Sequence, residues 1–488
     1  MLQVISSKSG VGAALMVGSQ SSSHTSRNIH QSADGSYFSG LETQWWKRPF
    51  YTRIVKEIRI TSQGGNLRPI AIVTSGPISR SSVDSLELEL AKAQEVTGVA
   101  LNSGLLSWHA LNHELDTSEI EEITAVLHKV GAELMIAGES HVGDDKTSKM
   151  YDARAAVQTY ILQLGDDPII CWLDSDLEFS ALIANEDELR INQPWPWVHM
   201  VWDQWLNGES VDIATGDVTG DPPIPASSTI LTNLRDLSQD GEVVNGSRWS
   251  IRDPAYDLSE IAKPDVLFPQ CKGIWFSQLE IVESILWKGT LNRPLVASEE
   301  ILSQPHRPWF VRGGLTVVYN RKAMYNSTPR INCMGFTARR GDSFWLVYNV
   351  QNMGFTVGNF PFPLLHCRGE LNINRVELIQ SFRSRFFGDF FGAASLKGTV
   401  LSLNDGFSAL EEHIHSAISA RATRSKEVLE LSLVELKVLN GAISKSESAI
   451  IEQALSETLS ELNSMDLKLV GNELCVQIAE YLEVESDD

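Results

Sequence analysis

The chain has 488 residues, is 43% hydrophobic and carries a formal net charge of −22, which allows about two to three domains and a sizeable core. The acidic balance argues against binding along a nucleic-acid backbone. Five cysteines, an odd number with no C-x-x-C pair, argue against a disulfide framework or a zinc knuckle. Without a secretory signal or an apolar run of ~18 residues, we expect a cytoplasmic chain with no membrane span.

Residues 1 to about 40 are Ser-rich and polar, and we expect an N-terminal extension at 1–67 that is partly disordered. From Arg68 onward, apolar runs alternate with helical spacing. We expect strands at 69–73, 96–101 and 133–137. Helices are expected at 83–96, 120–130 and 151–164. This alternation predicts an α/β fold, with a Rossmann-type, mostly parallel sheet and flanking helices.

The next apolar run, residues 169–173, is predicted to be a buried strand, and it ends in Asp174-Ser175-Asp176. The i, i+2 spacing directs the side chains of Asp174 and Asp176 to the same side. Two hard oxygen ligands at the carboxyl end of a strand suit a divalent cation and a phosphate-bearing ligand. An Asp-x-Asp triplet also occurs in solvated turns of acidic proteins, so its neighbours in the sequence matter.

The remaining chain divides into a Trp-rich insertion at about 180–305 and an acidic helical C-terminal domain at 401–488. In the insertion, the Gly/Pro-rich segment 214–223 is expected to be a solvated turn, with contact to an acceptor as the alternative for Asp217 and Asp221. Leucines of the tail recur at three- and four-residue spacing, with a break at Asn440-Gly441. We expect these amphipathic helices to pack on the body of the chain or on a second copy of it.

Several residues are candidates for binding a nucleotide diphosphate. The first strand ends in the small residues Thr74, Ser75 and Gly76, which let a ligand approach the backbone, although an ordinary strand-to-helix turn has the same composition. Arg154, at the start of the helix before the acidic strand, is placed to meet a diphosphate or, alternatively, to lie on the surface. Arg339 and Arg340 could add a further clamp.

In this order, the motifs resemble those of the nucleotide-sugar glycosyltransferases of the GT-A fold, over about residues 68–368 and within a catalytic domain at 68–400. The resemblance implies Mn²⁺ or Mg²⁺ at the Asp-x-Asp motif, with Asp176 as metal ligand and Asp174 nearer the ribose or the sugar. It implies His366 as a further metal or diphosphate ligand. The donor would be a UDP- or GDP-sugar, and the acceptor is not identified.

The same resemblance assigns the acceptor side to Gly313-Gly314 and the catalytic base of an inverting enzyme to Asp342. A divalent ion would offset the charge that develops on the leaving diphosphate, and one carboxylate would accept the proton of the acceptor hydroxyl. The alternative for Asp342 is a carboxylate that stabilises a helix N-terminus. The sequence departs from the family at Gly341, where an acidic residue often precedes the base. It also departs at Asn102-Ser103, where the second strand usually ends in acidic residues.

We therefore expect a metal-dependent glycosyltransferase that transfers a sugar to an acceptor hydroxyl, with inversion. A nucleotidyltransferase shares the α/β core and paired carboxylates, but it usually has a Gly-rich loop with a basic residue after the first strand, and residues 74–80 contain one glycine. A non-catalytic scaffold that acts through its helical tail is the second alternative. A transferase that modifies DNA bases is the third, and the acidic balance argues against it.

Overall fold

The structure is a computed structural model. It describes residues 3–5, 14–16, 68–74, 80–98, 106–110, 117–129, 133–136, parts of 155–163, 168–174, 176–184, 189–193, 195–207, 212–221, 225–238, 281–289, 291, 316–320, 323, 329–351, 353–368, 373–405, 409–439 and 443–484.

An eight-stranded sheet forms the centre of the molecule, in the order β5-β4-β3-β6-β11-β10-β14-β7. Its members are β3 (Ile70–Val73), β4 (Leu106–Ala110), β5 (Glu133–Ile136), β6 (Ile169–Leu173), β7 (Leu177–Glu178), β10 (Ile213–Gly220), β11 (Thr316–Asn320) and β14 (Val357–His366). Strands β7 and β11 run antiparallel to their neighbours, and all other pairs in this sheet are parallel. The predicted α/β architecture is thus confirmed, and the strands β5, β4, β3 and β6, which form one half of the sheet, are all parallel to one another.

Three small two-stranded sheets accompany the main one. They consist of β1 (Gln3–Ile5) with β2 (Ala14–Met16), β8 (Ala181–Ala184) with β9 (Leu189–Asn192), and β12 (Asn332–Cys333) with β13 (Phe336–Thr337).

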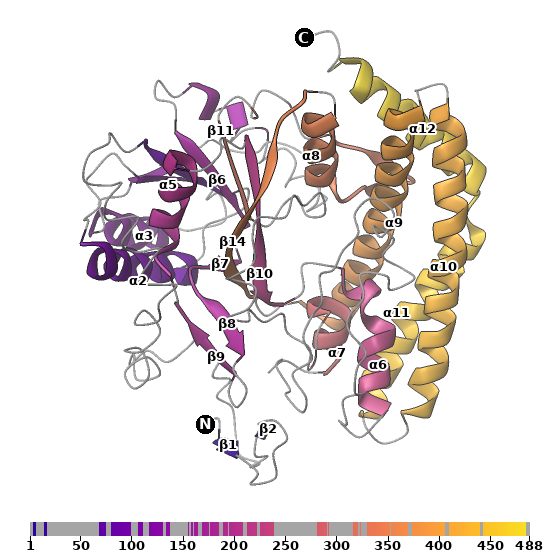
Figure 1. The fold of residues 1–488 in the computed structure, drawn as a ribbon. Helices are drawn as coiled ribbons and strands as arrows, with labels where there is room; N and C mark the ends of the chain where they lie inside the picture. The colour runs from indigo at the N-terminus through magenta and orange to yellow at the C-terminus, as the bar shows by residue number, and fades with distance from the viewer. Residues whose placement is uncertain are drawn as a thin grey trace.

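Alternate residues of β3 face two different layers of helices. Ile70 and Ile72 join the core that contains the apolar face of α2 (Arg80–Thr97), whereas Ala71 and Val73 pack in a separate cluster with side chains of α8 (Gly341–Gln351). All four strand residues are fully buried. In Figure 1, α2, α3 (Thr117–Lys129) and α5 (Trp197–Asn207) lie on one side of the sheet and α8 lies on the other. This two-sided burial explains the uninterrupted apolar run of the strand.

The strand predicted at 96–101 is wrong in its position. Val96 and Thr97 are the last turn of α2, and Val96 is buried on the same face as Ala93, one turn earlier. Gly98 follows with a left-handed φ of 71°, a conformation that commonly ends helices. The strand beside β3 is instead β4, which begins at Leu106. Helical spacing of the apolar residues continued to Val96 and outweighed the β propensity of the Val-Thr pair.

A buried carboxyl group, that of Glu89, anchors the start of α5 to α2. Its Oε1 accepts a hydrogen bond of 2.9 Å from the backbone N–H of Val198, and its Oε2 accepts one of 2.6 Å from Nε2 of Gln193. Burial raises the pKa of Glu89 to about 8, although these hydrogen bonds and one from the Trp197 backbone favour the ionised form.

Four long helices form a bundle beside α8, at the right of Figure 1. They are α9 (Arg375–Asp405), α10 (Leu410–Val438), α11 (Lys445–Ser464) and α12 (Leu467–Val484). Two short helices, α6 (Ile230–Ser238) and α7 (Ile281–Glu283), pack against the bundle, and the π-helical turn η3 (Ser284–Lys288) and the 3-10 turn η2 (Ala226–Ser228) contact α9.

The helical tail predicted from leucine spacing is confirmed, and the predicted break at 440–441 falls between α10 and α11. Ile451, Leu455 and Leu462 are fully buried against the other helices. Ser444 caps α11 through a reciprocal pair of hydrogen bonds with Glu447. The bundle begins earlier than expected, because α9 passes through residue 400 without interruption. None of the described helices combines the length and the apolar character needed to cross a membrane.

Candidate functional site

Asp176 and His366 meet because two neighbouring strand ends bring them together. After β6, the chain turns at Asp174, whose carbonyl accepts a hydrogen bond of 3.2 Å from the N–H of Leu177. Leu177 then pairs with His366, the last residue of β14. In this position Oδ2 of Asp176 lies 3.1 Å from Nε2 of His366. The backbone carbonyl of Asp176 also accepts a hydrogen bond of 3.0 Å from the N–H of Cys367.

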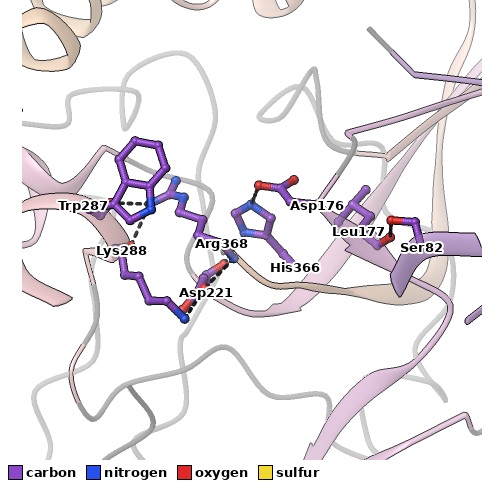
Figure 2. A network of polar contacts seen from close by, with 8 residues as sticks. All are labelled: Ser82, Asp176, Leu177, Asp221, Trp287, Lys288, His366 and Arg368. Carbon is purple, nitrogen blue, oxygen red and sulfur yellow. Dashed lines mark hydrogen bonds and ion pairs between the residues drawn. The ribbon is translucent and has the colours of Figure 1, made fainter. Parts of the chain in front are cut away.

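The other ring nitrogen of His366 fixes the orientation of the imidazole. Nδ1 lies 2.6 Å from the backbone carbonyl oxygen of Asp221, an acceptor, so Nδ1 carries the proton and donates it. The N–H of Asp221 in turn donates to the carbonyl of His366 at 2.8 Å. Gly220 makes this approach possible, since an added Cβ there would overlap the His366 carbonyl oxygen. Nε2 is thereby directed at Asp176, as Figure 2 shows.

Each partner of the Asp176–His366 pair stabilises the charged form of the other. Burial favours the neutral carboxyl of Asp176, but His366 and Arg368 outweigh it and hold the pKa of Asp176 below its usual value. Burial likewise disfavours a charged His366, and Asp176 outweighs it and raises the pKa of the imidazole. The Asp176 side chain remains 37% exposed, whereas that of His366 is 3% exposed. The carboxylate is therefore open to a ligand on one side.

Asp221 connects this pair to two cations. Its Oδ2 accepts a hydrogen bond of 2.8 Å from the backbone N–H of Arg368 and lies 3.5 Å from Nζ of Lys288. Nη1 of Arg368 donates to the carbonyl of Lys288 at 2.7 Å and to that of Trp287 at 3.4 Å (Figure 2). Asp221 is fully buried, so the solvated turn expected here is wrong: pairing of β10 with β14 draws the segment into the core.

The consecutive residues Arg339 and Arg340 lie in different surroundings. Arg340 has a left-handed φ of 75°, and its Nε and Nη2 donate to Oδ1 of Asp389 on α9 at 2.9 and 2.6 Å. The N–H of Arg339 donates to the carbonyl of Gly388 at 2.8 Å. An added Cβ on Gly392, one turn further, would overlap the Arg339 carbonyl oxygen. The backbone of Arg339 thus lies directly on α9.

The remaining predicted site residues are only partly described. Asp342 is in the first turn of α8 and half-buried, and makes no hydrogen bond or ion pair with any other described residue. Thr74 is buried at the end of β3. Ser75, Gly76 and Arg154 lie outside the described residues, as does the Gly313-Gly314 pair.

The chemistry of the Asp176–His366 pair fits a divalent cation in part. A carboxylate and an imidazole whose distal N–H is held by a backbone carbonyl are common metal ligands with their usual outer partner. Within the described part of the chain, no group of three or more His, Cys, Asp or Glu side chains is arranged to hold a metal. Magnesium commonly takes one or two protein ligands and completes its shell with substrate phosphates and water. Asp174, the third predicted ligand, lies close enough to interact electrostatically with Arg368.

The sequence interpretation did not single out Arg385 of α9 or Lys288 as parts of the site, and it did not use Arg368. The guanidinium carbon of Arg385 lies 3.4 Å from the centroid of the Trp287 ring, within cation–π range. A signal for Arg385 does exist: it interrupts a buried aromatic face of α9 made of Phe382, Phe386, Phe387, Phe390 and Phe391.

No protein-family model and no curated protein sequence matches this chain. Two mycobacterial proteins are among the solved structures that resemble it. Glucosyl-3-phosphoglycerate synthase from Mycobacterium tuberculosis, in complex with Mg²⁺ and uridine diphosphate, is 13% identical, covers 72% of this chain and 83% of its own, and gives a TM-score of 0.30. A mycobacterial protein is 14% identical, covers 72% of this chain and 78% of its own, and gives a TM-score of 0.31. Scores this low do not establish a common fold, so the likeness carries no argument here.

Proposed function

We propose that this chain is a metal-dependent glycosyltransferase, which transfers a sugar from a nucleotide-diphosphate sugar to an acceptor hydroxyl. The observation that carries the proposal is the contact of 3.1 Å between Asp176 and His366, at the ends of β6 and β14. The pair stands beside cationic side chains, a setting that suits a metal-bound diphosphate. A divalent ion, when bound, would supply Lewis-acid stabilisation of the leaving diphosphate.

The residues of the chain divide the remaining work. Asp176 and His366 would hold the ion, and the Asp221 carbonyl would keep Nε2 of His366 available for it. The proton that Nε2 shares with Asp176 at low pH would compete with the ion. Asp174 would lie nearer the ribose or the sugar, and Thr74 would belong to the donor loop.

Asp342 is our candidate for the general base, and transfer would then invert the anomeric configuration. Support comes from its half-buried place at the start of α8 and from its lack of a hydrogen-bonding partner among the described residues. A base must be free to accept the proton of the acceptor hydroxyl as the hydroxyl attacks. Arg339, three residues earlier, ties this segment to the arginines near Asp176.

A donor-hydrolysis screen tests the proposal. The full chain is incubated with UDP-, GDP- and dTDP-sugars, with Mn²⁺, Mg²⁺ or EDTA, and free nucleotide is measured. We expect turnover with one nucleotide and its loss in EDTA. Turnover without metal, or neither turnover nor metal-dependent nucleotide binding, contradicts the proposal. Release of pyrophosphate from a nucleoside triphosphate and a sugar phosphate would instead identify a nucleotidyltransferase.

The role of Asp342 has a separate test. Asp342→Asn is expected to lower kcat by about 100-fold or more, because general-base catalysis contributes about 10²–10⁴-fold, and to leave nucleotide binding unchanged. The anomeric configuration of the product is read by NMR. Retention of configuration would remove the base role from Asp342 and leave the transferase assignment intact.

A further inference from the structure

Three arginines from separate elements gather near the Asp176–His366 pair. Arg368 follows β14, and its guanidinium donates to the Trp287 carbonyl. Arg385 comes from α9 and stacks on the ring of the same tryptophan at 3.4 Å. Trp287 therefore places the two guanidinium groups next to each other.

Arg339 completes the cluster from a third direction. Its backbone N–H donates to the carbonyl of Gly388 on α9, one turn beyond Arg385, and Cγ and Cδ of its side chain lie beside that glycine. The charge of Arg339 acts on both Arg368 and Arg385, and that of Asp176 does so as well. The three cations and the candidate metal ligand thus share one neighbourhood.

The charges of this cluster are incompletely neutralised. Among the described residues, neither Arg339 nor Arg385 has a carboxylate within ion-pair distance, whereas Arg383, two residues before Arg385, pairs with Glu461. Burial and the two neighbouring arginines lower the pKa of Arg385 well below its ordinary value. Like charges held together in a partly desolvated place are unfavourable unless an anion joins them. In a chain with a net charge of −22, their proximity is not a consequence of bulk composition.

Arg368 and Trp287 lie away from the end of the site where the nucleotide is expected. Ser82 of α2, which donates to the Leu177 carbonyl at 3.0 Å, follows the donor loop after β3. In Figure 2, Ser82 and Leu177 stand on one side of the Asp176–His366 pair, and Trp287 and Arg368 stand on the other. A donor whose base and ribose contact the loop after β3 would direct its reactive end toward the arginines.

We propose that Arg339, Arg368 and Arg385 bind an anionic group of the acceptor, so that the acceptor is a small hydroxyl compound that carries a phosphate or a carboxylate. This inference rests on the proposed transferase function for its acceptor role. Bidentate guanidinium contacts to such groups are strong and directional. They would hold the hydroxyl of the acceptor near the donor sugar, which accounts for an arginine supplied by the C-terminal bundle.

Acceptor preference provides the first test. With the donor found by the hydrolysis screen, transfer is measured to glycerol, glycerate and glycerol 3-phosphate, which share a hydroxylated three-carbon chain and differ in charge. We expect kcat/KM to be about 100-fold higher for at least one anionic compound, since hydrogen bonds to charged groups are worth about 1.5–3 kcal/mol. Equal use of glycerol and both anions overturns the proposal.

A matched pair of substitutions on α9 provides the second test. Arg385→Gln removes a charge of the cluster, and Arg375→Gln removes an exposed charge at the start of the same helix. We expect Arg385→Gln to raise KM for the anionic acceptor about tenfold or more, with KM for the donor and the thermal midpoint unchanged, and Arg375→Gln to change none of these. A raised KM for the donor alone would show that the cluster binds the donor diphosphate and would overturn the proposal.

Binding of inorganic phosphate separates the failure of this inference from that of the proposed function. Calorimetry on the full chain, without donor or metal, measures phosphate affinity in the two variants. We expect Arg385→Gln alone to weaken it about tenfold. That result in a chain with no transferase activity would support the anion site and reject the function. Equal phosphate affinity in both variants, whether or not the chain turns over a donor, counts against the site.

Discussion

Arg339 and Arg340 are adjacent in the sequence, and the clusters they join differ in how completely charge is neutralised. Arg340 and Arg421 both donate to Asp389, and all three side chains are at most 8% exposed. Around Arg339 and Arg385, three arginines gather with no carboxylate paired to either of these two among the described residues. In the first cluster each arginine has a buried carboxylate partner, because the two share Asp389. The second has the unmatched charge expected of a binding site.

The largest loss of stability is expected from a substitution at Asp389, the carboxylate that Arg340 and Arg421 share. Asp389→Ala leaves Arg340 and Arg421 buried without their carboxylate, and removing one partner of a buried ion network costs about 3–5 kcal/mol. We expect urea unfolding to show a loss of that size in the free energy of unfolding. As a control, Glu461→Gln removes the more exposed pair with Arg383 and is expected to cost about 1 kcal/mol or less. Equal losses in the two variants would contradict the distinction between the clusters.

Glu89 provides a further comparison, because this buried carboxyl group has hydrogen-bond donors but no cationic partner in the part of the chain that the structure describes. Its pKa in the folded protein is about 8 against 4.5 as the reference, so between these values the folded state holds a proton that the unfolded state has lost. The free energy of unfolding is expected to fall as pH rises from 5 to 8, by an amount on the order of 3 kcal/mol. Glu89→Gln should flatten this dependence, measured by urea unfolding at several pH values; an unchanged slope would assign it to other groups.

A substitution at Asp176 tests the site beside the second cluster, that of Arg339, Arg368 and Arg385. Asp176→Asn keeps the shape of the side chain and removes the charge that a metal ion requires. We expect donor hydrolysis to fall by about 100-fold, which corresponds to about 2.7 kcal/mol, while the free energy of unfolding changes by about 1 kcal/mol or less because the side chain is 37% exposed. Glu412→Gln on the exposed side of α10 is the control. Full activity of Asp176→Asn would remove Asp176 from the metal site.

A substitution at Gly392 is expected to combine a moderate loss of stability with a smaller loss of activity than Asp176→Asn. Gly392→Ala pushes a methyl group into the Arg339 carbonyl, and overpacking of this kind costs about 1–3 kcal/mol. The displaced Arg339 should also weaken substrate binding. Gly398→Ala makes the same change on the same helix, but there the nearest atoms belong to Ile414 in the core and none belongs to Arg339. Activity should fall in the first variant and be kept in the second; a parallel response would contradict a link between α9 and the site.

Much of the fold could be predicted from the sequence, because local periodicity reports burial. Residues of β3 and β6 are apolar without interruption, since both faces of these strands are covered. The same periodicity applied to 96–101 failed, because a short Val-Thr pair belongs equally well to a helix end. The helical tail was predictable from its leucines, but its continuity with α9 was not. The start of that helix is fixed locally by a capping box between Asn374 and Glu377, a signal that leucine spacing does not report.

The site was predictable where a residue ends a strand and unpredictable where a distant segment supplies the partner. Asp176 and His366 each lie at the end of an apolar strand, and the structure brings them within 3.1 Å. Asp221 gave no such signal, because its burial depends on the pairing of β10 with β14. Arg340 was grouped with Arg339, although its carboxylate partner lies 49 residues away on α9. Sequence patterns carry no information on which of two adjacent arginines is neutralised.

The stacking of Arg385 on Trp287 bears on the order in which the protein is made. Asp176 leaves the ribosome more than 200 residues before Arg385, and the helices that pack against α9 follow later still. A nascent or truncated chain that ends before α9 would display the acidic half of the site without an arginine that completes it. Fragments of this protein that retain the whole sheet should therefore bind cations more readily than they bind acceptors, and the two halves supplied as separate chains are a natural pair for complementation.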